Sequence, residues 1–540
     1  MRSSIDPAPR VLRAPRLGGG DIGVCLTKIH LDRFTPTVVA EDPVRDRLIE
    51  KGRLHEGAVI DTLIADRGSV VCRTAADIVP GSTTPIVVEP ATATHEAIAT
   101  TLAAIQAGAD LIFGGRLAGR DSRLVGAPDV LVRLEDGYAA VDIKSHLVVG
   151  DRGMDVRSEE LGNLGKGGGQ QTVFRSSRRR DLLQVAHYWR LLDAVGHASS
   201  RPVGGIVGSD QPTVCLWADL DEGEPSLLTT LDRYLAEANQ VIDHGATDPE
   251  HPLVASWWRG ECKRCSWQSR CLGELESMGD PTLLNGIALA ERIELSEAGV
   301  RTIADVANLD VADSLVQDAD VVAQARAKTL GMLLWRSDQA EALPMVAREV
   351  DFDIETINGQ IYLAGFLITE DGASVYDPIV DWSGSAAGEA QVVASVFERF
   401  ADYGRHDTAL FHWTSYEERI LTEAAARHGA SIAGYSSVAD WFAEHAIDLW
   451  DWTRSNLVSP NGYGLKVIAP LCGFEWRDDD PGGLQSEMWF EALLDGNESM
   501  KGRLLAYNED DVIAQREVRR YVRSTVFPSV QDWPITQPHL

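Results

Sequence analysis

The sequence has no run of eighteen consecutive apolar residues, whereas a helix that crosses a bilayer needs about 20. Its N-terminus is rich in Pro, Arg and Gly and lacks the hydrophobic stretch of a secretory signal. We therefore expect no membrane span, no membrane partner and a cytoplasmic protein.

Positive charge is also scarce, with 50 Lys and Arg against 81 Asp and Glu and a net charge of -31. This balance argues against a broad surface that coats nucleic acid, because phosphates attract Lys and Arg. It does not exclude a carboxylate site beside a narrow basic groove. The clearest basic segment contains Arg175, Arg178, Arg179 and Arg180, and it predicts either phosphate contacts or the solvated start of a helix.

Only seven cysteines occur in 540 residues, and a reducing compartment argues against disulfides. Three of them, Cys262, Cys265 and Cys271, fall within ten residues, which indicates metal ligation. Since four thiolates satisfy either zinc or an iron–sulfur centre, spacing alone leaves both open. The candidates for the fourth ligand are Cys25, Cys72, Cys215 and Cys472.

The sequence lacks both internal repeats and a phosphate loop. The stretch Gly165-Lys-Gly-Gly-Gly169 has no Ser or Thr after its lysine and no earlier glycine at the required spacing. A chain of this length predicts two or three domains. Residues 1–275 mix helix and strand patterns, residues 276–345 are almost entirely helical, and residues 346–540 open with strands. We therefore expect an α/β multidomain protein.

The first acidic cluster lies on a predicted hairpin formed by Val130–Leu134 and Tyr138–Ile143. Side chains two residues apart on a strand point the same way, so Asp142 and Lys144 project together, within reach of Asp129. Two carboxylates can hold Mg²⁺, and a neighbouring lysine can orient water or polarise a phosphate.

An upstream histidine, this Asp…Asp-x-Lys pattern and a later Gln-x3-Tyr resemble the PD-(D/E)xK nucleases of the RecB type over about residues 20–275. The resemblance implies a restriction-endonuclease-like domain. It implies that His55, Asp129 and Asp142 are metal ligands and that Lys144 is catalytic. It also implies that Gln184 and Tyr188, one helical turn apart, support the site.

Cys25 resembles the lone N-terminal cysteine of the iron–sulfur members of these nucleases. With Cys262, Cys265 and Cys271 it would complete the ligand set of a [4Fe–4S] cluster.

The second acidic cluster starts with Asp353 and Glu355, which share one face of a predicted strand. Such close acids repel each other unless a cation lies between them. Far downstream, Tyr507 and Asp511 lie one turn apart on a predicted helix.

This arrangement resembles the DEDD 3′–5′ exonucleases of the ribonuclease H-like fold, in their tyrosine subclass. The resemblance implies Asp353, Glu355 and Asp511 as ligands of Mg²⁺ or Mn²⁺ and Tyr507 as the residue that orients the attacking water. The middle motif departs from the family, because Glu417 stands where an aspartate is usual, with Asp448 as a fallback. A ribonuclease H-like scaffold kept only for binding is the alternative.

In the helical middle, Gly286 and Gly299 are each flanked by apolar helix. These segments resemble helix-hairpin-helix elements, which bind phosphate through backbone N–H groups. A plain linker is equally consistent with the pattern.

The whole arrangement resembles a bacterial RecB-like iron–sulfur nuclease family. It implies a metal-dependent nuclease that hydrolyses single-stranded or end-exposed DNA in processing or repair. DNA is expected as the partner rather than RNA. An RNA exonuclease acting through the C-terminal half and a non-catalytic nucleic-acid-binding scaffold are the alternatives.

Overall fold

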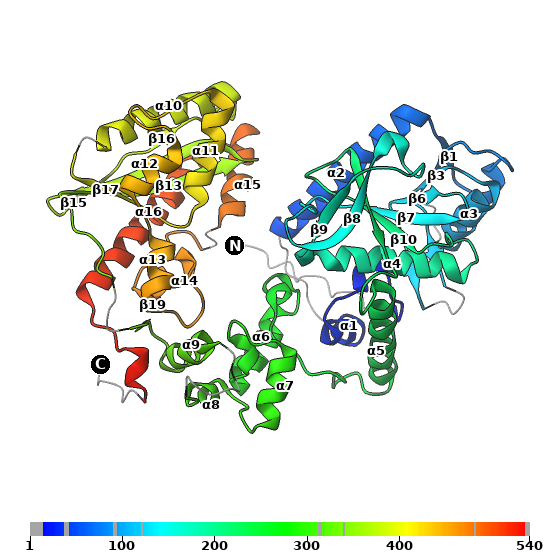
Figure 1. Ribbon diagram of the computed structural model, residues 1–540, viewed down its shortest axis with the longest axis horizontal. Coiled ribbons are helices and arrows are strands. Elements are labelled where there is room, and N and C mark those ends of the chain that lie inside the picture. Colours follow the sequence, from blue (N-terminus) through cyan, green and yellow to red (C-terminus); the bar gives the residue numbers. More distant parts are fainter. Residues whose placement is uncertain are drawn as a thin grey trace, which may run out of the picture. The chain divides into compact units, whose positions relative to one another are not determined.

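The computed structural model describes residues 14–36, 43–89, 94–119, 123–310, 316, 318–337, 341–404, 406–479 and 482–534. The chain forms two compact units, Met1–Ser256 and Trp257–Leu540, each with its own sheet (Figure 1). In the part of the chain that is described, no helix is both long and apolar enough to cross a membrane.

The first unit is built on a nine-stranded mixed sheet of order β1-β2-β3-β6-β7-β10-β11-β8-β9. Its strands are β1 (Val70–Cys72), β2 (Ile86–Val88), β3 (Leu111–Phe113), β6 (Val130–Arg133), β7 (Tyr138–Ile143), β8 (Gly153–Glu160), β9 (Gln171–Arg175), β10 (Val203–Val207) and β11 (Val214–Asp219). A separate two-stranded sheet pairs β4 (Leu117–Ala118) with β5 (Val125–Gly126). The helices are α1 (Leu26–Phe34), α2 (Pro43–Arg67), α3 (Thr94–Ala107), α4 (Arg179–Ala194) and α5 (Leu227–Thr247).

The predicted hairpin is confirmed and lies at the middle of this sheet. β6 and β7 pair antiparallel around the short turn at Gly137, and β7 then pairs parallel with β10. All six residues of β7 are buried, as a strand covered on both faces requires. Helix α4 packs on β7 and β10, so its side chains can reach the carboxyl end of β7.

The glycine-rich stretch forms a tight loop that closes on a carboxylate. Gly165 and Gly167 have left-handed φ values of 85° and 76°, and their backbone N–H groups donate to Glu159 at 3.2 and 2.7 Å. The indole of Trp217 donates to the same carboxylate at 2.6 Å. These contacts give the loop a structural role.

The second unit begins with short helices. They are α6 (Gln268–Met278), α7 (Leu289–Glu297), α8 (Ile303–Ala307) and α9 (Ala319–Leu330). Gly286 and Gly299 have left-handed φ values of 91° and 87°, which only glycine adopts without strain. Gly299 turns the chain from α7 into α8, where the Thr302 side chain accepts from the backbone N–H of Asp305. This segment is therefore helical only in part, with turns between α7, α8 and α9 and strand β12 at its end, and not almost entirely helical as predicted. Phosphate binding by its hairpins stays a prediction.

The second unit's main sheet has the order β15-β14-β13-β17-β18, with β16 also pairing with β14. Its strands are β13 (Arg348–Ile357), β14 (Gln360–Glu370), β15 (Ala373–Tyr376), β16 (Ile379–Val380), β17 (Thr408–His412) and β18 (Ala446–Asp448), while β12 (Leu334–Trp335) pairs with β19 (Leu457–Val458). The helices are α10 (Ala386–Tyr403), α11 (Tyr416–His428), α12 (Val438–His445), α13 (Leu449–Asn456), α14 (Leu465–Leu471), α15 (Gly483–Leu494) and α16 (Met500–Ser524).

Strand β13 separates a hydrophobic face from an acidic one. Val350, Phe352 and Ile354 point into a core shared with α10, α11 and α12. Because side chains alternate along a strand, Asp353 and Glu355 point to the opposite face, where α15 and α16 pack. The period of two therefore places both acids beside the helix that carries the third.

Candidate active site

Three carboxylates gather where α16 crosses β13. Asp353, Glu355 and Asp511 each offer an oxygen, and these atoms lie within 4.8 Å of one another. Within the described ranges this is the one group of three or more His, Cys, Asp or Glu side chains that meets this criterion. The strand pair and the helix residue predicted from the sequence are therefore brought together.

Burial and mutual repulsion disfavour ionisation of these acids. Desolvation, followed by the charge of Asp511, raises the pKa of Glu355 to about 8. Desolvation, then Glu355 and Asp511, raises the pKa of Asp353 well above its ordinary value. A divalent cation would offset both effects, and hard oxygen donors suit Mg²⁺ or Mn²⁺. The donor set therefore fits a metal.

Neighbouring side chains orient the carboxylates. The Ser486 hydroxyl donates to Glu355 Oε2 at 2.7 Å. The Asn508 amide donates to Asp353 Oδ2 at 2.7 Å, and its own oxygen accepts from the Tyr376 hydroxyl at 2.9 Å. The sequence did not reveal Asn508 or Ser486 as site residues, because no spacing signal links them to Asp353 and Glu355.

Tyr507 lies inside the site, beside a lysine that the sequence analysis missed. Lys466 Nζ donates to the Tyr507 hydroxyl at 2.7 Å and lies 3.4 Å from Asp511 Oδ2. The Trp476 indole donates to Asp511 Oδ1 at 2.7 Å. Desolvation, then the charges of Asp511 and Glu355, raises the pKa of Tyr507 far above its ordinary value. The raised pKa favours a neutral Tyr507 hydroxyl, which accepts from Lys466 and can donate its own hydrogen to another group.

Glu417, the predicted middle ligand, points into the protein. Its side chain is 3% exposed, and its Oε2 is buried without a hydrogen-bond partner among the described residues. His412 Nδ1 lies 3.4 Å from this oxygen but only 2.7 Å from the Thr414 carbonyl. Glu417 is not in the group of three, yet its charge contributes to the raised pKa of Asp353. Apart from its contact with His412, this buried oxygen has no partner among the described residues, which leaves it able to bind a second ion.

Asp448, the alternative to Glu417 as a metal ligand, caps the start of helix α13. Its Oδ1 accepts from the backbone N–H groups of Trp450 and Asp451 at the start of α13, and from Thr414 at 3.0 Å. An aspartate that caps a helix in this way is committed to backbone donors. Glu417 is therefore the better candidate.

The acidic group opens into a cavity of about 310 Å³. Asp353, Glu355, Tyr507 and Asp511 line it, together with Tyr416 on α11. This volume is at the lower end of ordinary ligand sites. The cavity thus gives a small substrate group access to the carboxylates.

The first unit brings together a second set of predicted residues at the end of β7. Lys144 Nζ donates to Asp142 Oδ2 at 2.7 Å and to Gln184 Oε1 at 3.0 Å. The Gln184 amide then donates to the Tyr188 hydroxyl at 2.7 Å. The carboxylate of Asp129 accepts from the backbone N–H of Ile143 at 2.7 Å. The hairpin and α4 therefore converge as the sequence pattern predicts.

Helix α2 adds a carboxylate that the sequence analysis passed over. Desolvation, followed by the charge of Asp142, raises the pKa of Glu56. Desolvation, then Asp142, also raises the pKa of Asp129 well above its ordinary value, and Glu56 adds to this shift. His55, which precedes Glu56 in α2, has a buried Nε2 without a hydrogen-bond partner among the described residues. Burial lowers the pKa of its ring. Both residues on α2 are thus candidates to join Asp129 and Asp142.

The basic segment mostly binds backbone carbonyls. Arg175 donates to Val149, Arg179 to Pro225, and Arg180 to Ile22 and Gly20. Arg178, Arg179 and Arg180 are exposed to solvent. These contacts favour a structural role at the start of α4 over dedicated phosphate binding.

The cysteines of the predicted cluster are partly exposed. Cys25 precedes α1 in the first unit. Cys262 and Cys265 lie at a 3₁₀ turn (Gly260–Arg264) in the second unit, and Cys271 lies on α6. Cys72 and Cys215 are buried, as expected for core residues, whereas Cys472 is only partly buried. Metal ligation by the four cysteines stays a prediction.

Comparison with known proteins identifies one domain. Residues 350–523 match the RNase_H superfamily, and this segment runs from β13 almost to the end of α16. It contains Asp353, Glu355, Tyr507 and Asp511. The C-terminal part of the chain is therefore a ribonuclease H-like domain, whose superfamily indicates a metal-dependent nuclease acting on nucleic acid. No curated protein matches the chain.

Proposed function

We propose that the protein is a divalent-metal-dependent nuclease whose C-terminal site removes nucleotides from the 3′ ends of DNA. The observation that carries this proposal is the group of three carboxylates beside Tyr507, with Glu355 and Asp511 buried and Asp353 half-buried, within the segment that matches the RNase_H superfamily. The hydroxyl of a protonated Tyr507 is suited to hold the attacking water.

Asp353, Glu355 and Asp511 would hold Mg²⁺ or Mn²⁺, and the buried Glu417 Oε2, which lies 3.4 Å from His412 Nδ1, would serve a second ion. Bound there, such ions supply positive charge to the scissile phosphate and lower the pKa of a bound water. The chain's own part is to fix the ligands through Ser486 and Asn508 and to exclude bulk water from a buried site.

The first unit would supply a second nuclease centre of the PD-(D/E)xK type. Asp129 and Asp142, joined by His55 or Glu56, would hold the metal, and Lys144 would contact the phosphate or the attacking water. The chain of hydrogen bonds from Asp142 through Lys144 and Gln184 to Tyr188 supports this assignment. We assign single-stranded or end-exposed DNA to this centre, in DNA processing or repair. A [4Fe–4S] cluster held by Cys25, Cys262, Cys265 and Cys271 belongs to the same proposal.

The test is cleavage of end-labelled single-stranded and duplex DNA and RNA with Mg²⁺ or Mn²⁺. We expect Lys144→Ala protein to release 3′ mononucleotides from DNA and Lys144→Ala/Asp353→Ala protein to release none. Glu423→Gln, on the exposed face of α11, is the matched control and should behave as its parent. If the Lys144→Ala protein releases no mononucleotides with either metal, the C-terminal domain is a binding scaffold. Faster release from RNA would point to an RNA exonuclease.

A further inference from the structure

Lys466 contacts several groups of the acidic site, yet the proposed function gives it no role. It lies in the first turn of α14, and its side chain is 35% exposed. Its Nζ lies 2.7 Å from the Tyr507 hydroxyl and 3.4 and 3.5 Å from the two oxygens of Asp511. The ammonium also lies 4.7 Å from the Tyr507 ring centre and 5.6 Å from that of Trp476.

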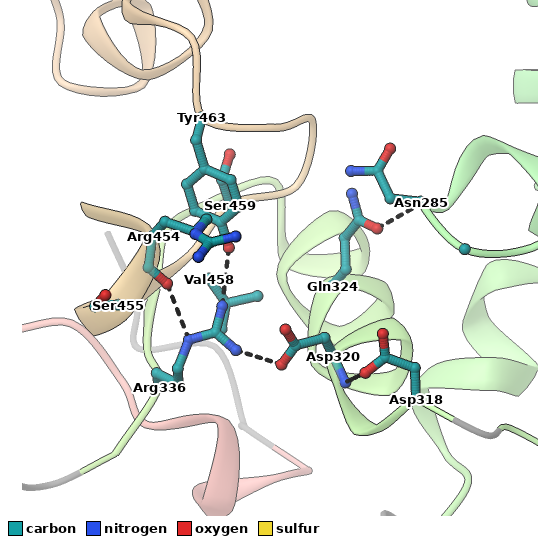
Figure 2. A pocket seen from close by; sticks show the side chains of 11 residues that line it. Asn285, Asp318, Asp320, Gln324, Arg336, Arg454, Ser455, Val458, Ser459 and Tyr463 are labelled. Carbon is teal, nitrogen blue, oxygen red and sulfur yellow. Dashed lines mark hydrogen bonds and ion pairs between the residues drawn. The ribbon is translucent and has the colours of Figure 1, made fainter. Parts of the chain in front are cut away.

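The segment just before Lys466 is held in place by contacts with Arg336 and Trp413. Arg336 lines a cavity of about 450 Å³, and Figure 2 shows its side chain reaching toward Asp320 and Tyr463. Arg336 donates to the Arg454 carbonyl at 3.2 Å and to the Tyr463 hydroxyl at 3.1 Å, and it pairs with Asp320 (Figure 2). The Trp413 indole donates to the Tyr463 carbonyl at 3.1 Å. Tyr463, three residues before Lys466, is therefore fixed at both its backbone and its ring.

The packing around Tyr507 holds its ring and leaves only the hydroxyl hydrogen to be oriented. Tyr507 is 3% exposed, and its ring packs edge-on against Trp489 at 5.7 Å. The ring is thus held by packing, and only its hydroxyl hydrogen rotates. Because the hydroxyl oxygen accepts from Lys466, its hydrogen is directed away from the ammonium. Tyr507 and Asp511, which lies 3.4 Å from the ammonium, both line the cavity.

We propose that Lys466 is a positioning residue of the C-terminal site, which orients the Tyr507 hydroxyl toward the attacking water and balances the charge of Asp511. The inference rests on the proposed exonuclease function and adds a group that acts through Tyr507. A purely structural lysine would stabilise the fold through Asp511, and its effect on turnover would not depend on Tyr507.

The test is a double-mutant cycle in the Lys144→Ala background, with Lys466→Met, Tyr507→Phe and the double variant. We expect Lys466→Met to lower kcat for mononucleotide release about 10- to 100-fold with KM within about twofold. Lys466→Arg should retain more of kcat than Lys466→Met does. In the Tyr507→Phe background, the Lys466→Met substitution should lower kcat by less than about threefold. An equal loss in both backgrounds overturns the proposal.

Lys501→Met is the matched control. Lys501 is 36% exposed, pairs with Glu498 at 2.6 Å and lies over the Trp382 ring at 6.0 Å. It shares the charge, exposure and aromatic neighbour of Lys466 but does not contact the acidic group. Its substitution should leave kcat unchanged, and an equal loss of kcat would overturn a role specific to Lys466.

Calorimetric titration with Mn²⁺ gives a readout that does not depend on turnover. Because Lys466→Met removes a positive charge next to Asp511, we expect it to tighten Mn²⁺ binding at least about threefold. Unchanged or weaker binding overturns the charge-balancing role. A parent protein that releases no mononucleotides refutes the proposed function instead, and the Mn²⁺ titration then decides whether Lys466 acts on the acidic group.

Discussion

At the scale of single residues, the acidic group makes the protein sensitive to pH when metal is absent. Burial and Asp511 raise the pKa of Glu355 from 4.5 to about 8, so the folded state keeps a proton that the unfolded chain releases. Stability is therefore highest below about pH 4.5 for this group and falls as pH rises toward about pH 8. We expect the Tm of the EDTA-treated protein to drop across this window in scanning calorimetry.

Glu355→Gln removes that titration and should flatten the pH dependence of Tm. Mn²⁺ should raise Tm more at about pH 8 than at about pH 6, because metal competes with the bound proton. An identical slope for Glu355→Gln and the parent would contradict the assignment of this proton to Glu355.

The environment of Glu417 also leads to a prediction. Its buried Oε2 has no close hydrogen bond among the described residues, so Glu417→Gln removes a charge and, with it, the ion pair with His412 at 3.4 Å. We expect mononucleotide release to fall about 10- to 100-fold while one Mn²⁺ still binds to the remaining three acids. Unchanged turnover, with unchanged metal stoichiometry in the titration, would show that Glu417 is no ligand.

The sequence predicted the acids of this site but not their supporting residues. Strand alternation puts Asp353 and Glu355 on one face, and helical spacing puts Tyr507 one turn from Asp511. That the two pairs share a site was implied by the resemblance to the DEDD exonucleases. Lys466 reaches the site only because the distant Tyr463 is anchored by Arg336 and Trp413. Contacts of that kind depend on packing and leave no periodic signal.

At the scale of elements, the acidic site depends on how α16 is held against β13. Arg519 on α16 is fully buried and donates to both carboxylate oxygens of Asp351 on β13, at 2.9 and 2.6 Å. Asp351 lies two residues before Asp353 on the same face. This ion pair therefore fixes the register between Asp353 and Asp511.

Arg519→Met should leave the Asp351 charge buried and unpaired. We expect a loss of about 3–5 kcal/mol in the free energy of unfolding, measured by urea titration. We also expect weaker Mn²⁺ binding to the protein that remains folded. Arg520→Met, one residue later and 66% exposed, should cost less than about 0.5 kcal/mol. Equal losses in the two variants would contradict the role of the buried pair.

The elements themselves were predictable to different degrees. The hairpin of β6 and β7 follows from alternation and turn residues, and its observed bounds differ from the predicted ones by at most one residue. The nine-stranded order of the first sheet could not be predicted, because β7 pairs with β10 across 59 residues of intervening chain. Such pairings are set by tertiary packing.

At the scale of the whole molecule, two candidate sites occupy two compact units. We expected the first domain to end near residue 275, after the cysteines, whereas the compact unit ends at Ser256. Cys262, Cys265 and Cys271 therefore belong to the second unit by their contacts. Cysteine spacing does not report which core a segment packs against.

The division into two units predicts two separable activities. Asp142→Ala should remove the metal-dependent cleavage of single-stranded DNA that the first unit supplies and leave mononucleotide release intact, because the acidic group of the second unit contains no residue of the first. Asp353→Ala should have the opposite effect, and the double variant should lose both. The measurement is the length distribution of products from 3′- and 5′-labelled strands with Mn²⁺. Since distant sites without shared partners act independently, each single variant should keep the other activity within about twofold. Loss of both activities in either single variant would mean that one site processes the strand and the other only binds it.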